Sequence, residues 1–505
     1  MKKRSALLFL LLLCSSSAFA QHFNWALSLA QPAKSIVTSL AADSSGNIYT
    51  LGFHQTGTDL VLGQRATGTI FLTKCDSNGH ELWIKNFPGS GCGFDMAIDR
   101  SGRIIIGGSF LGSLVIGSDT LRSNRQSGLF LASFDAAGNT IWHIEDTTHG
   151  NNGAISITTD KKNNIYITGL ENDLDGFFAK FTSSGSLLWK KTESGVRIFD
   201  DIVVDDSGNI YAGGCCEPQA KFDTIVLPKL PGQPGYVVFL AKFDSAGTAE
   251  WVHQDPYVTF NIANELAVTN WGIVRYHYTH DAFTTMSLEI FSPAGKMSAQ
   301  LDVYGSLGSL GDVLMNTLAA DRNGNIYIAD AQSDTLHVRK TEFFITFDTL
   351  MIRLDTVRTI GSSMIAAEAL LVSGQDIYLA GSFIDSKLGL DNHTVINHNN
   401  VSLFENDLFL TQLSPDSPSA DVYSPPREND EALLYPNPCS NLINIKTNFT
   451  DAPVVQIQNV LGETVCRDKL SSSPASINTS HLSSGEYFLI VRDGERTFVK
   501  RFIRY

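Results

Sequence analysis

Apolar and polar residues alternate in short runs along most of the chain, and compact turn motifs separate these runs. In DSSGNIYTLG, residues 43–52, apolar runs lie on both sides of a D-S-S-G turn. An Asp can hydrogen-bond its own backbone two residues on, and Gly46 can adopt the positive φ that closes such a turn. The phrase therefore predicts two antiparallel strands joined by a hairpin. Close copies begin at Asp99, Asp160, Asp205 and Asp321.

A second phrase follows the first at a variable distance and ends in tryptophan. Its pattern is an apolar run, then D-x-x-G or a variant of it, and a Trp four residues after the Gly. The four clear copies end at Trp83, Trp142, Trp189 and Trp251. Because this phrase also predicts a hairpin, each repeat contains two hairpins and therefore four strands.

The number of repeats follows from the spacing of the first phrase. SGQDIYLAG supplies a sixth copy near residue 372, and the interval between Asp205 and Asp321 is long enough for one more. VTNWGIVRYHYT, which enters its turn near Thr269, fills that interval as a degenerate copy. Seven four-stranded units of roughly 45 to 60 residues match the blades of a β-propeller better than the much shorter coils of a β-helix.

The two ends of the repeat region predict how it closes. The seventh unit runs through DLFLTQL and breaks off into a Pro- and Ser-rich segment, so it lacks the fourth, Trp-bearing strand. That strand occurs instead near the beginning of the chain, in FNWALSLA around Trp25. We therefore predict a seven-bladed, all-β propeller whose last blade is completed by the N-terminal strand, so that no blade is left with an open edge.

The residue patterns of the repeats resemble those of two propeller families. Phe-Leu-x-Lys-x-Asp-x-x-Gly with a following Trp, paired with D-x-x-G-N-I-Y-x-x-G, resembles the bacterial SBBP β-propeller repeats, and DRNGNIYIAD is similar to an NHL repeat. The resemblance covers roughly residues 21–415 and is weakest in the fifth unit. It implies a fold and no particular activity, because these families host unrelated functions.

A second region begins after a linker rich in Pro, Ser and Asp at residues 416–430. Residues 431–505 contain short alternating strands whose lengths and turns predict a small Ig-like β-sandwich. The segment resembles the type A C-terminal sorting domain of the type IX secretion system. The residues that carry the resemblance are Tyr435, Pro436, Asn437, Pro438, Gly462, Gly485 and Tyr487. It implies Sec export to the periplasm of a Gram-negative bacterium, then passage across the outer membrane by the type IX machinery to the cell surface or the medium.

Residues 1–20 read as a secretory signal peptide. Lys2, Lys3 and Arg4 precede a short apolar run and the segment SSSAFA, so cleavage is expected between Ala20 and Gln21. No other segment approaches the length of about 18 apolar residues that a transmembrane helix needs. The net charge of -15, from 37 basic and 52 acidic residues, argues against nucleic-acid binding. Six cysteines follow the signal, and the sequence leaves their pairing open.

The sequence motifs that are typical of catalytic, phosphate-binding or metal-binding sites are nearly absent. The chain has no H-E-x-x-H, G-x-S-x-G or P-loop, and GSGCG at residues 89–93 lacks the strand-loop-helix context of a glycine motif. His277, His280 and Asp281 could bind a metal or act as a base, but residues 277 and 280 of one strand would point to opposite faces. The D-x-x-G phrases suit turns better than calcium loops, because Arg or Lys often follows the Asp. No cofactor and no catalytic residue is therefore predicted.

The expected recognition surface lies opposite the hairpin turns, where connections between repeats differ most. The segments that differ most, and are therefore expected to form this surface, are His54–Thr69, Leu111–Gly128, Cys215–Tyr236 and Ile384–Asp407. The favoured function is a binding protein for an extracellular glycan or surface protein, without catalysis. The alternative is a propeller lyase or hydrolase that acts on an extracellular polymer. Carboxylates and a His that converge would favour the enzyme, and a shallow aromatic surface would favour binding.

Overall fold

A computed structural model of the chain is all-β, and no helix occurs among the residues that it describes. It divides into two compact units, Met1–Ser417 and Pro418–Tyr505. The structure describes residues 22–504 with the exception of 30–34, 56–67, 125, 148–151, 173–174, 230–234, 256–263, 280–284, 305–316, 322, 333–334, 347–348, 362–364, 384–385, 391–392, 399–405, 415–431, 436–438, 440, 448–453, 460–463, 470–474, 484 and 494–495.

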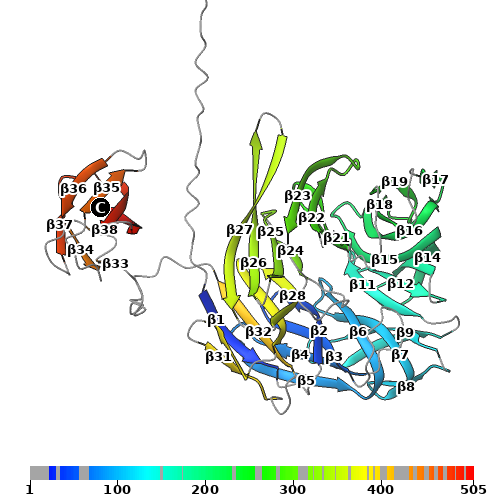
Figure 1. Cartoon of the computed structure of the whole chain (residues 1–505). Helices are drawn as coiled ribbons and strands as arrows, with labels where there is room; N and C mark the ends of the chain where they lie inside the picture. The colour runs from blue at the N-terminus through cyan, green and yellow to red at the C-terminus, as the bar shows by residue number, and fades with distance from the viewer. Residues whose placement is uncertain are drawn as a thin grey trace, which may run out of the picture. The chain divides into compact units, whose positions relative to one another are not determined.

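The first unit contains seven antiparallel sheets built on four-stranded paths, which we number in chain order (Figure 1). Sheet 1 comprises β2 (Ser35–Ala42), β3 (Ile48–Gln55), β4 (Gly68–Cys75) and β5 (Glu81–Phe87). Sheet 2 comprises β6 (Gly89–Ile98), β7 (Ile104–Ile116), β9 (Gly128–Phe134) and β10 (Thr140–Asp146), with β8 (Asp119–Arg122) paired to β7. Sheet 3 comprises β11 (Gly153–Thr159), β12 (Ile165–Glu171), β13 (Asp175–Phe181) and β14 (Leu187–Thr192). Sheet 4 comprises β15 (Ser194–Val204), β16 (Ile210–Phe222), β18 (Val237–Phe243) and β19 (Ala249–Gln254), with β17 (Ile225–Val226) paired to β16.

The remaining sheets of this unit follow the same order. Sheet 5 comprises β20 (Asn264–Thr269), β21 (Gly272–Thr279), β22 (Thr285–Phe291) and β23 (Met297–Tyr304). Sheet 6 comprises β24 (Leu318–Ala320), β25 (Ile326–Gln332), β26 (Thr335–Thr346) and β27 (Thr349–Gly361). Sheet 7 comprises β28 (Ile365–Ser373), β29 (Asp376–Phe383), β32 (Asp407–Ser414) and β1 (His22–Ser28). β30 (Lys387–Leu390) and β31 (His393–Ile396) form a separate hairpin.

The N-terminal strand completes sheet 7, as its sequence predicts. β1 pairs antiparallel with β32, and Trp25 lies opposite Gln412; Figure 1 shows the blue first strand beside the yellow-orange β32. Successive sheets contact one another through their first strands: β2 contacts β6, β6 contacts β11, and the series continues through β15, β20 and β24 to β28. β28 in turn contacts β2, so sheet 7 packs against sheet 1.

The core of this unit lies between neighbouring sheets. Aromatic and aliphatic side chains of adjacent sheets form shared clusters, such as Tyr49 and Phe53 of sheet 1 with Ile104 and Phe130 of sheet 2. The alternating pattern of the repeats explains this arrangement, because every inner strand presents apolar side chains to a neighbour on each face.

The second unit has two small sheets. One comprises β33 (Ala432–Tyr435), β34 (Leu442–Thr447) and β37 (Ala475–Asn478). The other comprises β36 (Thr464–Lys469), β35 (Val454–Asn459), β38 (Gly485–Asp493) and β39 (Arg496–Arg504). Ile443, Ile457 and Leu489 meet in its apolar core, as expected for inner faces of a sandwich.

Candidate functional site

The repeated D-x-x-G phrases form hairpin turns whose carboxylates serve the turn itself. Asp160 Oδ1 accepts the amide N–H groups of Lys162 (2.8 Å) and Asn164 (2.9 Å), and Oδ2 accepts Asn164 Nδ2 (2.7 Å) and the Tyr166 hydroxyl (3.1 Å). Burial would raise the pKa of Asp160, but these hydrogen bonds outweigh it and the pKa is lowered. Both oxygens are occupied within the hairpin, which supports the interpretation as turn chemistry.

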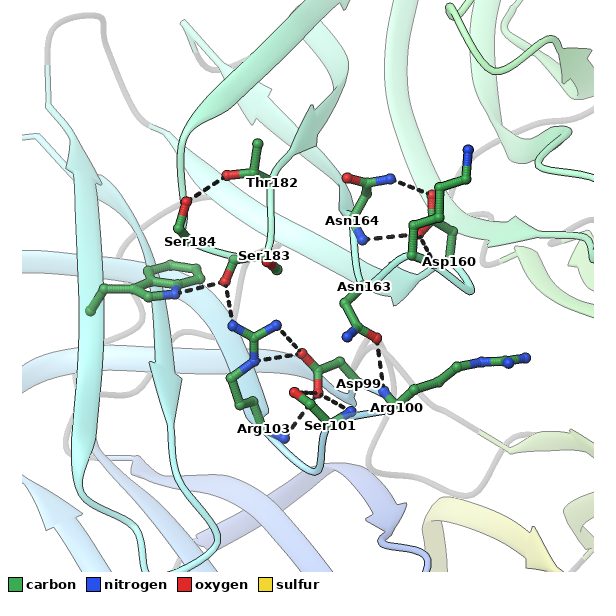
Figure 2. Close-up of polar contacts among 12 residues, drawn as sticks. Asp99, Arg100, Ser101, Arg103, Asp160, Asn163, Asn164, Thr182, Ser183 and Ser184 are labelled. Atoms are coloured by element: carbon green, nitrogen blue, oxygen red, sulfur yellow. Dashed lines mark hydrogen bonds and ion pairs between the residues drawn. The ribbon is translucent and has the colours of Figure 1, made fainter.

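Turns of neighbouring sheets also contact each other (Figure 2). Arg103 of sheet 2 donates to Asp99 Oδ2 in its own turn and to the Ser183 carbonyl of sheet 3, at 2.7 and 2.9 Å. The amide of Arg100 donates to Asn163 Oδ1 of the next turn at 3.1 Å. Asn163 takes the place of the turn glycine and has the positive φ of 62° that this place requires. The repeated phrase therefore joins sheets as well as strands.

The tryptophan of each second phrase packs on the corresponding turn of the next sheet. Trp142 of sheet 2 donates its indole N–H to the Ser183 carbonyl of sheet 3 at 3.1 Å, and a Cβ added at Gly185 would lie 2.9 Å from its ring. Trp25 of sheet 7 makes the same contact with sheet 1, donating to the Ser77 carbonyl at 2.9 Å. The Trp four residues after the turn Gly thus forms a contact between neighbouring sheets. One copy of the motif, taken by itself, does not predict this contact.

Near the opposite end of the sheets, five of the seven carry a Gly paired with a Phe of the third strand. These pairs are Gly52–Phe71, Gly108–Phe130, Gly169–Phe177, Gly214–Phe239 and Gly381–Phe409. The first strand is bulged beside each of these glycines, which brings a carbonyl oxygen close. A Cβ at Gly108 would lie 1.9 Å from the Cys92 oxygen, so no larger residue fits there.

Sheet 5 departs from this pattern and places a buried ionic cluster there. His277 stands at the glycine position, opposite Ser287, and β20 pairs with β21 without a bulge. Arg275 lies two residues earlier with its side chain fully buried, and it faces Glu289 at a position where sheets 2 and 3 pair Ile with Ala. The Arg275–Glu289 pair is therefore a second difference between sheet 5 and the regular sheets. The sequence shows this region only as a degenerate repeat.

Arg275 holds two carboxylates. Its Nε donates to Glu289 Oε2 at 2.8 Å, and its Nη2 lies 2.8 to 2.9 Å from both oxygens of Asp255, which follows β19 of sheet 4. Burial would raise the pKa values of Asp255 and Glu289, but the guanidinium and neighbouring histidines lower both. His253 Nε2 lies 3.2 Å from Asp255 Oδ1, and His277 Nε2 lies 3.5 Å from Glu289 Oε1. Both carboxylates are therefore held ionised at the junction of sheets 4 and 5.

The predicted His277, His280 and Asp281 group is thus only partly placed. His277 lies in this cluster, and the other two residues lie outside the described residues. Among the described residues, no group of three or more His, Cys, Asp or Glu side chains is arranged to hold a metal ion. His277 contacts Glu289 of β22, and Asp255, which follows β19, binds Arg275 of the same cluster, so the cluster extends beyond the HYTHD motif.

A second polar group lies where sheets 7 and 1 meet. Ser28 Oγ donates to Asp407 Oδ2 at 3.0 Å and lies 3.2 Å from His398 Nδ1, which is 3.2 Å from the same carboxylate oxygen. A hydrolytic triad needs Ser and Asp on different nitrogens of the His ring. Here both contact Nδ1, so the group does not activate Ser28. Asp407 is buried and holds the His398 side chain, 58% exposed, at the surface.

Parts of two predicted recognition segments meet beside this group. His54, at the start of one segment, lies with Nδ1 2.6 Å from Ser35 Oγ, and burial lowers its pKa. Asn406, near the end of another, donates to the Ser35 carbonyl at 3.0 Å. The segments come together because sheet 7, which β1 completes, packs against sheet 1, which begins with β2.

Two other predicted recognition segments contain packed hairpins. Leu114, Ile116 and Leu121 of the β7–β8 hairpin are buried in the core shared by sheets 1 and 2. Phe222 and Leu227 of the β16–β17 hairpin are buried with residues of sheets 3 and 4. Their apolar side chains fill space between sheets, so these described parts serve packing.

Cys75, Cys92, Cys215, Cys216 and Cys439 are free thiols. Cys215 and Cys216 are adjacent in β16 and lie opposite Val238 and Val237. Burial raises the pKa of Cys216 to about 12, which leaves this thiol uncharged.

The residues of the sorting motif are only partly described. Tyr435 ends β33 opposite Asn444, and Gly485 begins β38 opposite Arg504. Tyr487 is buried, and its hydroxyl donates to the Ser483 carbonyl at 2.9 Å, which ties β38 to the turn before it. The other predicted positions lie outside the described residues: Pro436, Asn437, Pro438, Gly462, and the cleavage pair Ala20 and Gln21.

Within the described part of the chain we find no helical segment with the length and hydropathy of a membrane span.

Comparison with known proteins places the second unit. Residues 433–504 match the model of the Secretion system C-terminal sorting domain family, which confirms the predicted sorting domain. No protein among the curated ones matches the chain significantly. Solved structures similar to it include a protein of unknown function from Bacteroides caccae, with 10% identity, a TM-score of 0.32, and coverage of 64% of this chain and 94% of that one. A puromycin hydrolase S511A mutant complexed with PGG has 11% identity and a TM-score of 0.42, covering 71% of this chain and 51% of that one. The C-terminal region is a secretion-system sorting domain, and it indicates export to the cell surface or the medium of a Bacteroidetes-type bacterium.

Proposed function

We propose that the chain is an exported seven-bladed β-propeller that binds a glycan or another protein outside the cell. Residues 1–20 are its signal peptide, 21–415 the propeller, 416–430 a linker and 431–505 the sorting domain. The sorting domain engages the type IX secretion machinery. The propeller repeats are of the SBBP and NHL type, and the favoured role is non-catalytic.

Three sets of contacts support the propeller arrangement. Seven four-stranded sheets follow one another in chain order, and β28 of the last packs against β2 of the first. Trp25 joins sheet 7 to sheet 1 as Trp142 joins sheet 2 to sheet 3. Glu368 of sheet 7 accepts the Val37 amide of sheet 1 at 2.7 Å. Equivalent contacts at ordinary junctions and at the last-to-first junction are what closure of a propeller requires.

The observation that carries the extracellular binding function is the sorting-domain match at residues 433–504. The surface expected to bind is opposite the hairpin turns, where His54, His398 and Asn406 gather beside the junction of sheets 7 and 1. Segments of unlike sequence on a rigid scaffold are suited to selective binding.

The test is a pull-down screen of glycans and surface proteins with the mature chain 21–505. We expect a specific partner whose capture weakens when the described rim residues His54 and His398 are replaced by Ala. Capture that is unchanged by these replacements would contradict binding at this surface. Removal of 431–505 is expected to leave the protein in the periplasm, and cell fractionation measures this.

A second candidate function, a lyase or hydrolase of an extracellular polymer, is favoured by one observation. Asp255, Glu289 and His277 converge at the junction of sheets 4 and 5. Arg275 neutralises the two carboxylates in part, which speaks against proton transfer by them. Incubation of the mature chain with extracellular polysaccharides, followed by measurement of reducing ends and unsaturated products, decides between the two functions.

A further inference from the structure

We propose that two copies of this chain pair through the outer edge of β27 in sheet 6 and form a twofold-symmetric dimer. The pairing is antiparallel and centred on Leu354, so that the β26–β27 ribbons of the two copies form one continuous four-stranded sheet. The dimer does not depend on the ligand that the proposed function assigns to the propeller.

β27 is the longest of the outer strands. It has 13 residues, whereas the outer strands of the other six sheets, β1, β5, β10, β14, β19 and β23, have 6 to 8. β27 pairs with β26 on one side, and no described strand pairs with its other side. β23 of sheet 5 contacts β27 without pairing with it, so the hydrogen-bonding edge of β27 has no partner among the described strands.

The ribbon of β26 and β27 extends beyond the rest of sheet 6. β25 pairs with β26 only as far as Lys340, whereas β27 follows β26 to Thr346. Residues 341–346 and 349–354 therefore pair only with each other, and Figure 1 shows the two strands as a long yellow-green ribbon. Because a two-stranded ribbon is only marginally stable in water, additional strands would stabilise it.

The edge of β27 lacks most of the features that protect edge strands. Natural edge strands are commonly short, or carry Lys, Pro or a bulge that prevents pairing with another chain. β27 contains neither Lys nor Pro. Its pairing with β26 is regular from Thr349 to Thr356 and shifts register only after that point. This regular part is therefore suited to pairing with a further strand.

The charges of the ribbon select a second copy as the partner. Within the ribbon, Arg353 is paired with Glu342 and Asp355 with Lys340, so each pair joins opposite charges. When two β27 strands pair antiparallel around Leu354, Arg353 of each copy is opposite Asp355 of the other. Opposite positions of an antiparallel pair share a face. The signs then alternate across all four strands, in the order Glu342, Arg353, Asp355 of the second copy and Lys340 of the second copy.

The same charges fix the register of the dimer. A centre at Arg353 would set the two Arg353 residues opposite each other, and a centre at Asp355 would do the same with the two Asp355 residues. Like charges directly opposite are destabilising. The centre at Leu354 avoids both pairs and places Ile352 opposite Thr356, which are residue types that favour strands. Such a self-complementary edge is what a twofold dimer requires.

Sedimentation equilibrium of the mature chain 21–505 over a range of concentrations measures the dimer, and we expect a monomer–dimer equilibrium. Arg353→Asp and Asp355→Arg each set like charges opposite each other when one variant pairs with itself. Each is expected to raise the dimer dissociation constant at least tenfold. An equimolar mixture of the two variants should dimerise as the unchanged chain does, because both pairs between the copies then have opposite signs.

The mixture separates the interface from effects within one chain. The pairs inside each ribbon are as unfavourable in the mixture as in the separate variants, so recovery reports the contact between copies. The matched control is Lys85→Asp in β5, the outer strand of sheet 1, which reverses a charge on a different edge and should leave the dimer unchanged. Circular dichroism checks that all variants fold.

Three results would overturn the inference: a chain that stays monomeric at every concentration, a dimer unchanged in both single variants, and a mixture that dimerises no better than the separate variants. If one single variant does not fold, Arg353→Asp/Asp355→Arg decides, since it restores opposite signs between two identical copies. A protein that binds the monomeric chain in the pull-down screen and is lost in Arg353→Asp assigns the edge to that protein and rejects the dimer.

Discussion

Sheets 1 to 4 and sheet 5 have the same four-stranded topology but different interiors. In sheets 1 to 4 a first-strand bulge, a glycine and a phenylalanine pack together at the end opposite the turns. In sheet 5 the bulge is absent, and His277 and Ser287 replace that pair. The loss of the bulge removes the carbonyl that excludes a Cβ elsewhere. A drifted repeat thus became able to hold large polar side chains.

Sheets 1 to 4 and sheet 5 share one other feature, which is a row of buried polar residues in their first strands. Four residues before each turn stand Ser39, Asp95, Ser156, Asp201, Glu265 and Thr317, in sheets 1 to 6. Each carboxylate bridges to a neighbouring sheet: Asp95 accepts Ser39 Oγ (2.8 Å) and the Ile157 amide (2.7 Å). In sheet 7, Glu368 lies one residue earlier and bonds to sheet 1. The first strand of sheet 5 therefore contacts its neighbours through polar groups, as the first strands of the other sheets do.

Among the substitutions, the largest expected effect comes from breaking the ionic cluster of sheet 5. Arg275→Ile leaves Asp255 and Glu289 buried without their cation, and we expect a loss of about 4 kcal/mol of unfolding free energy. The double variant Arg275→Ile/Glu289→Ala recreates the Ile–Ala pair of sheets 2 and 3 and should be more stable than the single one. Urea unfolding followed by tryptophan fluorescence measures this, because all six Trp lie in the first unit. If the double variant is no more stable than the single one, the unpaired carboxylate of Glu289 is not the cause of the stability loss.

The matching change in the regular sheets is Gly108→Ala. Its Cβ would lie 1.9 Å from the Cys92 oxygen, so we expect a loss of about 3 kcal/mol in the same unfolding assay. Gly389→Ala is the control, since nothing lies within 4 Å of a Cβ there. His277→Ala in sheet 5 should cost less than Gly108→Ala; the reverse order would refute the role assigned to the bulge.

The row of carboxylates predicts how stability depends on pH. Burial raises the pKa of Asp95 to about 7 and that of Glu265 to about 8, although hydrogen bonds to the carboxylates act in the opposite direction. A pKa raised on folding stabilises the protein below the unfolded pKa of about 4, and this contribution is lost as pH rises through 7 to 8. At about 1.4 kcal/mol per pH unit for each group, we expect the unfolding free energy to fall by about 6 kcal/mol between pH 5 and pH 8.

Two variants resolve this pH dependence by region. Asp95→Asn in sheet 2 and Glu265→Gln in sheet 5 should each flatten the decline, measured by urea unfolding at several pH values. The Glu265 variant should flatten it at the higher pH. A decline equally steep in both variants would assign it to other groups.

The smallest expected effect concerns the turns. Asp160→Ala removes four hydrogen bonds within the sheet 3 turn, and we expect a loss of about 1.5 kcal/mol. The degenerate turn of sheet 5 relies on Thr269 Oγ1, which accepts the Trp271 amide at 3.1 Å, and Thr269→Ala should cost about 0.5 kcal/mol. Thermal unfolding of both variants checks the order. A larger loss in Thr269→Ala would mean that the drifted turn is the stronger one.

The candidate sites show where sequence reasoning ends. HYTHD contains His277, but Glu289, which His277 contacts, lies on β22, and Asp255, which binds Arg275 of the same cluster, follows β19 of another sheet. Leu111–Gly128 and Cys215–Tyr236 are predicted recognition segments, yet several apolar residues of their hairpins pack in the core. An inserted hairpin packs its apolar side chains between sheets, whereas a recognition loop exposes its side chains. Amino-acid composition distinguishes the two poorly.

Local chemistry determined the strands, the turns and the repeat count in this sequence, because an Asp, a turn Gly and alternating apolar residues act over a few positions. The pairing of Trp25's strand with β32 was also foreseen, since a missing strand at one end matched a spare strand at the other. Tertiary structure alone decided which unlike residues meet. Asp255 and Arg275 are brought together only when sheets 4 and 5 pack side by side, and Ser28 meets His398 only when β1 pairs with β32. The energy of such contacts depends on burial, which no short stretch of sequence contains.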